Sequence, residues 1–165
     1  NLQNGDRANW RNRNVADRYE AGSVMKIFSV AAALETGMVT PATQYYCENG
    51  AYAVGRKIVR DTKKLGTLTL SDIVKVSSNI GVIKMSEEIG KDNLYAGLKN
   101  FGFGEKTGIE CPGEAAGYLS APNVWSRMDL AAISFGHGMS VTPIQISTAT
   151  SAIPNSCILI KPYLV

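Results

Sequence analysis

The sequence predicts an α+β fold that is mostly helical. Two long stretches, residues 23–36 and 80–89, are rich in apolar residues and predict helices. Between them, residues 44–61 hold short runs of aromatic and β-branched residues, interrupted by the turn sequence Asn49-Gly50, and predict a small β region. The chain has 165 residues, of which 45% are hydrophobic and 19% charged, so its size and composition suit one globular domain.

The remaining elements follow from local signals along the chain. Residues 1–19 are polar and predict a loop that leads into the first helix, which Gly37 should end. Thr142-Pro143 is a typical helix start, with an N-cap residue before a proline. Residues 105–124 are rich in glycine and proline and predict an ordered loop. The expected strands are 45–47, 52–54, 57–59 and 157–160, and the further helices are 72–76, 92–100, 127–133 and 143–152.

The first helix carries an unusual lysine. Lys26 is the only ionisable residue between Glu20 and Glu35, and its neighbours are apolar or small. A helix that is apolar on all sides is buried, and a buried lysine must be paired or have a lowered pKa. Ser23 lies three residues earlier on the same helix face, and Gly22 permits a turn that leaves Ser23 at the positive end of the helix dipole. The pair predicts a serine nucleophile that is activated by an amine.

A second polar group interrupts the later helical stretch at Ser77-Ser78-Asn79. Serine and asparagine commonly cap and interrupt helices, which would account for the break by itself. The functional interpretation is that the Ser77 hydroxyl relays a proton and the Asn79 amide binds the lysine or a substrate carbonyl. Ser77-x-Asn79 and Ser23-x-x-Lys26 each occur once in the chain.

Composition excludes several classes of function. A net charge of +3 is too small and too scattered for nucleic-acid binding. The longest apolar run is far shorter than the roughly 20 residues that span a bilayer. The three cysteines are far apart, without a Cys-x-x-Cys, and the chain has one histidine, so we expect no metal and no cofactor. Unpaired thiols are the favoured interpretation, with one disulfide left open.

Together, Ser23-x-x-Lys26 and Ser77-x-Asn79 resemble the signature of the penicillin-recognising serine enzymes. The resemblance covers nearly the whole chain and is to the transpeptidase domain of class B penicillin-binding proteins. One departure is Ala21, where the family usually has proline. The further matching segments are Arg11-Asn12-Arg13 with Asp17, Glu20 to Ser23, Ser77 to Gly81, Phe101 to Gly104, Thr107 to Ile109, Pro112 to Glu114, Trp125-Ser126, Phe135 to Gly138 and Val141 to Gln145.

Lys106-Thr107-Gly108 has the letters of the family's third motif, but we reject it as that motif. The family's lysine box lies on a strand beside the active site, whereas glycines and a proline surround this triplet and predict a loop. By resemblance, the true box is expected beyond Val165. We assign no catalytic role to His137, which lies between two glycines in a turn or close-approach site. Asp61 and Glu114 are interpreted as structural hydrogen-bonding carboxylates.

The resemblance implies a partial transpeptidase domain over residues 1–165, without a second domain, of the penicillin-binding or serine β-lactamase-like fold with an incomplete antiparallel sheet. It implies a peptidoglycan D,D-transpeptidase in which Ser23 forms the acyl-enzyme, Lys26 is the base, and Ser77 and Asn79 act in catalysis and substrate binding. The implied partners are peptidoglycan stem peptides, β-lactam antibiotics and other cell-wall synthesis proteins.

The implied location is the extracytoplasmic face of the bacterial cytoplasmic membrane, with any anchor outside this chain. Three alternatives stay open: a β-lactam sensor, a serine β-lactamase-like domain, and a non-catalytic cell-wall scaffold. The sequence does not distinguish a role in division from one in elongation or sporulation.

Overall fold

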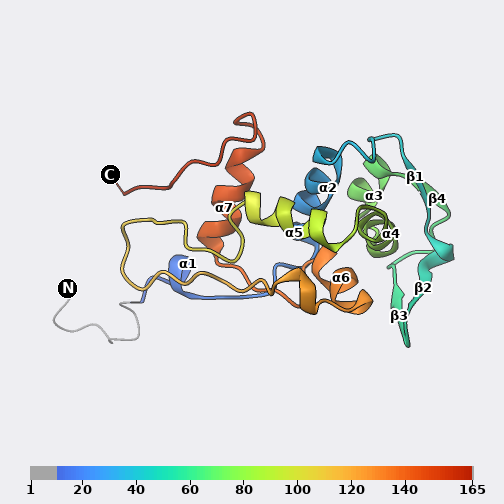
Figure 1. Cartoon of the computed structure of the whole chain (residues 1–165), viewed down its shortest axis with the longest axis horizontal. Coiled ribbons are helices and arrows are strands. Elements are labelled where there is room, and N and C mark those ends of the chain that lie inside the picture. The colour runs from blue at the N-terminus through green and yellow to red at the C-terminus, as the bar shows by residue number, and fades with distance from the viewer. Residues whose placement is uncertain (1–10, 165) are drawn as a thin grey trace. The chain divides into compact units, whose positions relative to one another are not determined.

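The structure is a computed structural model that describes residues 11–164 (Figure 1), and these residues form two compact units. The first unit contains residues 11–19, 101–119 and 140–164, and the second contains residues 20–100 and 120–139. A single partial domain without a second one stays a prediction. Within residues 11–164, no helix has both the length and the apolar character needed to cross a membrane.

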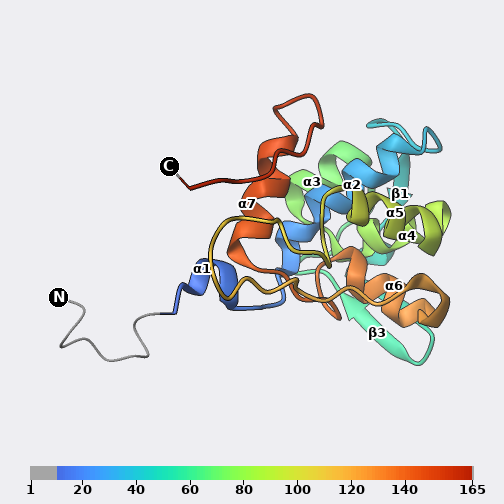
Figure 2. The same ribbon diagram turned by 60° about the vertical axis from the view of Figure 1, so that its left-hand side comes forward.

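The second unit is organised around helix α2 (Met25–Glu35), which continues from a short 3₁₀ helix, η2 (Gly22–Val24). The helices α3, α4, α5 and α6 all pack against α2 (Figures 1 and 2). At its contact with α5, Gly97 lies so close to Ala32 that a Cβ on Gly97 would be 2.2 Å from the Ala32 Cβ. The bounds of these helices are Leu70–Val76 for α3, Asn79–Ile89 for α4, Lys91–Asn100 for α5 and Arg127–Ser134 for α6.

One face of α2 is less buried than the sequence predicted. Phe28 is buried, as expected for the core side of an apolar helix, but Ile27 is 45% exposed and Leu34 is 37% exposed. Val74 on the neighbouring α3 is also exposed. The prediction that α2 is buried on all sides is therefore wrong for the face that carries Ile27 and Leu34, whereas Lys26 lies on the buried side.

The β region consists of two antiparallel pairs. Strands β2 (Ala51–Val54) and β3 (Lys57–Arg60) cover the predicted strands 52–54 and 57–59, and they pair with each other as an antiparallel hairpin. Strand β1 (Gln44–Tyr46) instead pairs with β4 (Thr67–Thr69), a strand that the sequence analysis missed. A short 3₁₀ helix, η3 (Glu48–Gly50), forms the turn expected at Asn49-Gly50.

Capping residues explain where the helices begin. Thr69 caps α3 through the amide of Asp72, so this helix starts two residues before the predicted position. Ser78 caps α4 through the amide of Gly81. Ser126 forms a capping box at α6, which follows a short 3₁₀ helix, η4 (Pro122–Val124). Each cap satisfies an amide that has no acceptor within the helix.

The first unit contains α1 (Arg13–Ala16) and α7 (Pro143–Ala152), which pack against each other. The predicted start of α7 is confirmed, because Thr142 forms a capping box with Gln145. Residues 13–16 are helical where a loop was predicted, and residues 1–10 of that loop lie outside the described part of the chain. The predicted strand over 157–160 is wrong, since these residues form no strand in the structure.

Candidate active site

Ser23 lies on a tight turn at the start of the central helix. Gly22 has a φ of 56°, a conformation that glycine adopts without steric cost, and its N–H donates to the carbonyl of Gly136 over 3.0 Å. This bond holds the turn that precedes the serine. The Ser23 side chain is exposed, and its N–H belongs to the first turn of a helical segment, where amides lack an intrahelical acceptor.

A second contact between the same two segments involves Glu20. Its carboxylate accepts the Gly138 N–H at 2.9 Å and lies 2.8 Å from His137 Nδ1. These contacts hold the pKa of Glu20 below its ordinary value. The sequence predicted a turn or close-approach site at residues 136–138, and the structure confirms that interpretation. The signal was a pair of glycines around one polar residue.

Lys26 is 2% exposed and points into the second unit. Its Nζ donates to the backbone oxygen of Ser77 at 2.6 Å and to the Ser77 hydroxyl at 2.9 Å. Burial lowers the pKa of Lys26 to about 8, because a buried ammonium loses its hydration, while the charge of Asp61 acts in the opposite direction. The sequence predicted a buried lysine that is paired or has a lowered pKa, and the structure shows both.

Ser77 is the corner between α3 and α4. It has a φ of 58° and a ψ of 45°, the left-handed conformation, which costs a non-glycine residue about 1–2 kcal/mol. The N–H of Ser78 donates to the carbonyl of Ile73 across this corner, which closes the end of α3. The turn leaves both oxygens of Ser77 available to Lys26. Strain of this kind is often found at functional sites.

Asn79 lies at the first position of α4, but its amide does not contact Lys26. Its Nδ2 donates to the backbone oxygen of Arg60 at 3.0 Å, and its N–H donates to Asp61. Ser23 and Lys26 are likewise not joined by a hydrogen bond within residues 11–164. The structure thus brings Lys26 to Ser77, places Ser23 one turn before the lysine, and anchors Asn79 to the end of the β hairpin.

Lys106-Thr107-Gly108 lies in a loop of the first unit. The carboxylate of Glu114 accepts bonds from the Thr107 N–H and hydroxyl, both at 2.6 Å, and from the Gly108 N–H at 3.2 Å. The triplet is not part of a strand, which supports its rejection as the third motif. Glu114 is structural in this loop, as the sequence analysis expected.

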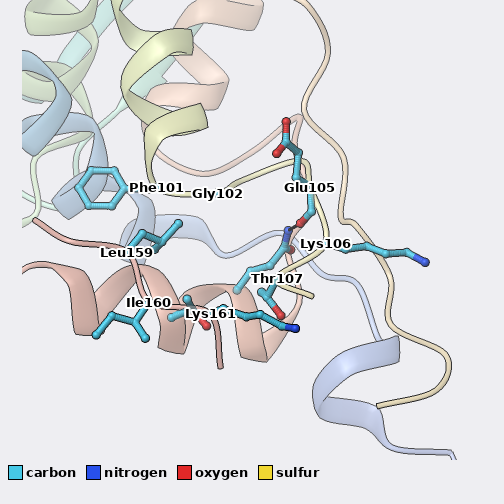
Figure 3. A pocket seen from close by; sticks show the side chains of 10 residues that line it. Phe101, Gly102, Glu105, Lys106, Thr107, Leu159, Ile160 and Lys161 are labelled. Carbon is cyan, nitrogen blue, oxygen red and sulfur yellow. Dashed lines mark hydrogen bonds between the residues drawn. The ribbon is translucent and has the colours of Figure 1, made fainter. Parts of the chain in front are cut away.

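The same loop borders a pocket of about 240 Å³ in the first unit (Figure 3). Phe101 and Leu159 provide part of its apolar lining, while Lys106 and Lys161 extend away from these side chains in Figure 3. None of the four predicted catalytic residues lines this pocket. All the residues that line the pocket belong to the first unit.

The described residues contain no grouping of three or more His, Cys, Asp or Glu side chains that could hold a metal ion. The three cysteines, Cys47, Cys111 and Cys157, carry free thiols. Cys47 is buried, and this burial raises the pKa of its thiol.

Comparison with known protein families shows to which family the chain belongs. A model described as the penicillin binding protein transpeptidase domain matches residues 1–165. The chain belongs to the penicillin-binding protein transpeptidase family. It is 38% identical to Stage V sporulation protein D of Bacillus subtilis over 93% of this chain and 24% of that protein. It is 34% identical to a probable peptidoglycan D,D-transpeptidase, PenA, of Neisseria flavescens, over 84% of this chain and 34% of the relative.

Solved structures of this family share the fold. The transpeptidase domain of penicillin-binding protein 3 from Burkholderia pseudomallei aligns with a TM-score of 0.90 and 33% identity, over 94% of this chain and 47% of the other. Penicillin binding protein 3 of Mycobacterium tuberculosis, solved with aztreonam, aligns with a TM-score of 0.85 and 31% identity, over 93% of this chain and 35% of the other. The predicted family and α+β fold are therefore confirmed. The chain spans about a quarter to a third of the length of these curated relatives.

Proposed function

We propose that this chain supplies the nucleophile and proton-transfer groups of a peptidoglycan D,D-transpeptidase, which β-lactams acylate at the same serine. The carrying observation is the contact between Lys26 Nζ and the Ser77 hydroxyl at 2.9 Å, one helical turn from Ser23. A lysine with a pKa of about 8 is neutral in roughly a tenth of the molecules at pH 7. That fraction can take a proton from a serine hydroxyl, which an ordinary exposed lysine rarely does at this pH.

In the proposed reaction, neutral Lys26 accepts the Ser23 Oγ proton while Oγ attacks the carbonyl of the penultimate D-alanine of a stem peptide. The bond from that carbonyl to the terminal D-alanine breaks, and the leaving amine takes a proton from the Ser77 hydroxyl. The Lys26 ammonium, 2.9 Å away, restores the proton to Ser77. An amine of a neighbouring stem then resolves the acyl-enzyme and forms the cross-link.

Two further groups have roles in this proposal. The Ser23 N–H, in the first turn of its helical segment, contributes one donor to the oxyanion hole. In the proposed complex, the Asn79 side chain gives up its hydrogen bond to the Arg60 backbone oxygen and binds the substrate amide instead. Ser23 and Lys26 draw together when substrate binds, because catalytic hydrogen bonds are often long in unliganded enzymes.

We place this activity at the extracytoplasmic face of the bacterial cytoplasmic membrane, since cross-linking of stem peptides takes place in the wall outside that membrane. Other cell-wall synthesis proteins are the proposed partners. Two features support the location: the family to which the chain belongs, and the similarity to the Neisseria relative, which is named as a probable peptidoglycan D,D-transpeptidase.

The test is mass spectrometry of the full-length protein after treatment with penicillin. We expect one penicilloyl adduct on the peptide that carries Ser23, absent from Ser23→Ala and present in the control Ser71→Ala, which changes an exposed serine of α3. An adduct on another residue would overturn the assignment of Ser23.

Turnover distinguishes the transpeptidase from its alternatives. Cross-linking of stem peptides supports the proposal. Rapid hydrolysis of penicillin would identify a β-lactamase, and stable acylation without cross-linking would identify a sensor. An absence of any adduct in the folded protein would leave a non-catalytic scaffold.

A further inference from the structure

Asp61 binds the segment that carries Ser77 and Asn79. It directly follows β3, and its Oδ2 accepts the Ser78 hydroxyl at 2.6 Å. Its Oδ1 accepts the N–H groups of Asn79 at 2.6 Å and of Ile80 at 3.2 Å. All three donors lie at the start of α4, directly after Ser77. A carboxylate in this position satisfies amides without an intrahelical acceptor and lies at the positive end of the helix dipole.

The residue before Asp61 completes the attachment. The backbone oxygen of Arg60 accepts the Asn79 side chain at 3.0 Å. Arg60 and Asp61 therefore hold Asn79 through both its side chain and its backbone. Ser78 is 1% exposed and donates to the same carboxylate, so these bonds fix the corner at Ser77 from its C-terminal side. Lys26 of helix α2 contacts the corner at Ser77 itself.

Asp61 also acts on Lys26 through its charge. Its carboxylate is the one charged group in the described residues that raises the pKa of Lys26, against the lowering caused by burial. The helices packed against α2 carry other charged side chains, none of which contributes to the shift: Asp72 and Lys75 on α3, Lys84, Glu87 and Glu88 on α4, Lys91, Asp92 and Lys99 on α5, and Arg127 and Asp129 on α6.

We propose that Asp61 is a positioning residue of the acylation site, which holds the Ser77–Asn79 corner in place and supplies the negative charge that balances the Lys26 ammonium. This inference rests on the proposed function of Ser23 and Lys26. It assigns two separable effects to Asp61. The hydrogen bonds of its carboxylate hold the Ser77–Asn79 corner in position, and its negative charge favours the protonated form of Lys26. The alternative is that Asp61 has only a structural role, in which its carboxylate caps α4 and has no influence on the reaction.

Asp61→Asn separates the two effects. The amide oxygen of asparagine can still accept the N–H groups of Asn79 and Ile80, whereas its Nδ2 cannot accept the Ser78 hydroxyl. Most contacts of the corner therefore remain while the negative charge is lost. Acylation requires neutral Lys26, so its rate falls on the acid side as the lysine becomes protonated. Removing a charge that raises the pKa of Lys26 moves this acid limb to lower pH. The rate at pH 6 should therefore fall less, relative to its plateau, in Asp61→Asn than in the wild type.

The experiment measures the second-order rate of acylation of the full-length protein by a fluorescent penicillin between pH 5 and pH 9. The matched control is Asp129→Asn, since Asp129 also bonds the N-cap serine of its helix, at 2.7 Å from Ser126 Oγ, but does not act on Lys26. We expect the acid limb to shift in Asp61→Asn and to stay in place in Asp129→Asn. An unchanged limb in Asp61→Asn, or an equal shift in both variants, would overturn the inference.

Asp61→Ala tests the effect of shape. It removes both the charge and the acceptors, so we expect acylation to fall about 10- to 100-fold at the plateau, the cost of a small misplacement of reacting groups. Asp61→Asn should restore most of this loss. Equal plateau rates in the wild type and Asp61→Ala would contradict the positioning role.

Failure of the proposed function gives a different result. If the folded wild-type protein forms no adduct at Ser23, rates of acylation cannot be measured. The effect of the Asp61 charge on the pKa of Lys26 can still be tested. In that case NMR titration of the Lys26 side chain in the wild type and Asp61→Asn decides: a lower pKa in the variant supports the charge relation, and equal values overturn it.

Discussion

Gly22 and Gly136 approach each other more closely than any other residue type would allow. The Gly22 N–H donates to the Gly136 carbonyl over 3.0 Å, and a Cβ added to Gly136 would lie 2.0 Å from the Gly22 oxygen. The contact is between backbone atoms, so no side-chain rotation can relieve such a clash. The turn that presents Ser23 therefore depends on the absence of a side chain at residue 136.

The first prediction follows from this contact. Gly136→Ala should displace the turn before Ser23 and lower the rate of acylation by about 100-fold, as expected when a reacting group moves by about 1 Å. The control is Gly37→Ala, since Gly37 also has a positive φ, 68°, but no atom lies within 4 Å of an added Cβ. Both variants carry the conformational cost of alanine at positive φ. Equal acylation rates in the two variants would contradict this prediction.

The second prediction concerns the stability of the protein against pH. The pKa of Lys26 is about 8 in the folded protein, against an ordinary 10.5. Between these values the unfolded chain binds more protons, so the free energy of unfolding rises with pH, by up to about 3 kcal/mol from this group. Below about pH 8, Lys26 is protonated in both the folded protein and the unfolded chain. Its effect on the free energy of unfolding is then independent of pH.

Lys26→Met removes this pH dependence. The test is urea unfolding of the wild type and of Lys26→Met at pH 7 and at pH 10.5. At each pH, it gives the difference in free energy of unfolding between the two proteins. Relative to the variant, the wild type should gain stability at the higher pH. A difference that is the same at both pH values would show that burial does not lower the pKa of Lys26.

The third prediction separates stability from activity at Ser77. Glycine adopts the left-handed conformation of Ser77 without steric cost, so Ser77→Gly should change the free energy of unfolding by less than about 1 kcal/mol. Loss of the hydroxyl should lower acylation about 100-fold, the typical effect of an acid–base group. Ser71→Gly, in the helical conformation of α3, should show the reverse: reduced stability with normal acylation. Normal acylation in Ser77→Gly would remove Ser77 from the proposed proton path.

The fourth prediction tests the rejection of Lys106 as the third-motif lysine. Its side chain is exposed in a loop of the first unit, so Lys106→Ala should acylate at the wild-type rate. Lys26→Ala, measured beside it with the same fluorescent penicillin, should not acylate detectably. A strong loss of acylation in Lys106→Ala would place the triplet in the reaction centre after all.

Local signals were enough to predict most of the helices. Ser78, Ser126 and Thr142 each cap a helix whose start the sequence indicated, because capping depends on neighbours within three residues. The pairing of β1 with β4 was missed because it joins segments more than twenty residues apart and depends on tertiary contacts. The apolar run at 157–160 has β propensity, but without a paired strand in the described structure it forms no ladder.

The sequence named the residues of the candidate site, but it did not predict the contacts that they make. An unpaired lysine in an apolar helix identified Lys26 and its neighbour Ser23, because burial of a charge is costly and visible in the sequence. The spacing did not reveal that Lys26 binds Ser77, since this contact requires the left-handed corner between α3 and α4. Nor did it show that Asn79 faces Arg60, which depends on where the β hairpin ends.

Under the proposed function, the contact of Gly97 with Ala32 has a consequence for the evolution of drug resistance. Helix α2 carries Lys26 and directly continues the η2 turn that carries Ser23. Where Ala32 of α2 contacts Gly97 of α5, there is no room for a methyl group on Gly97. A substitution there that pushes α2 would move Ser23, the proposed nucleophile, away from the β-lactam and from the proposed substrate alike. We therefore expect selection by antibiotics to favour changes at the rim of the site and to leave this helix crossing unaltered.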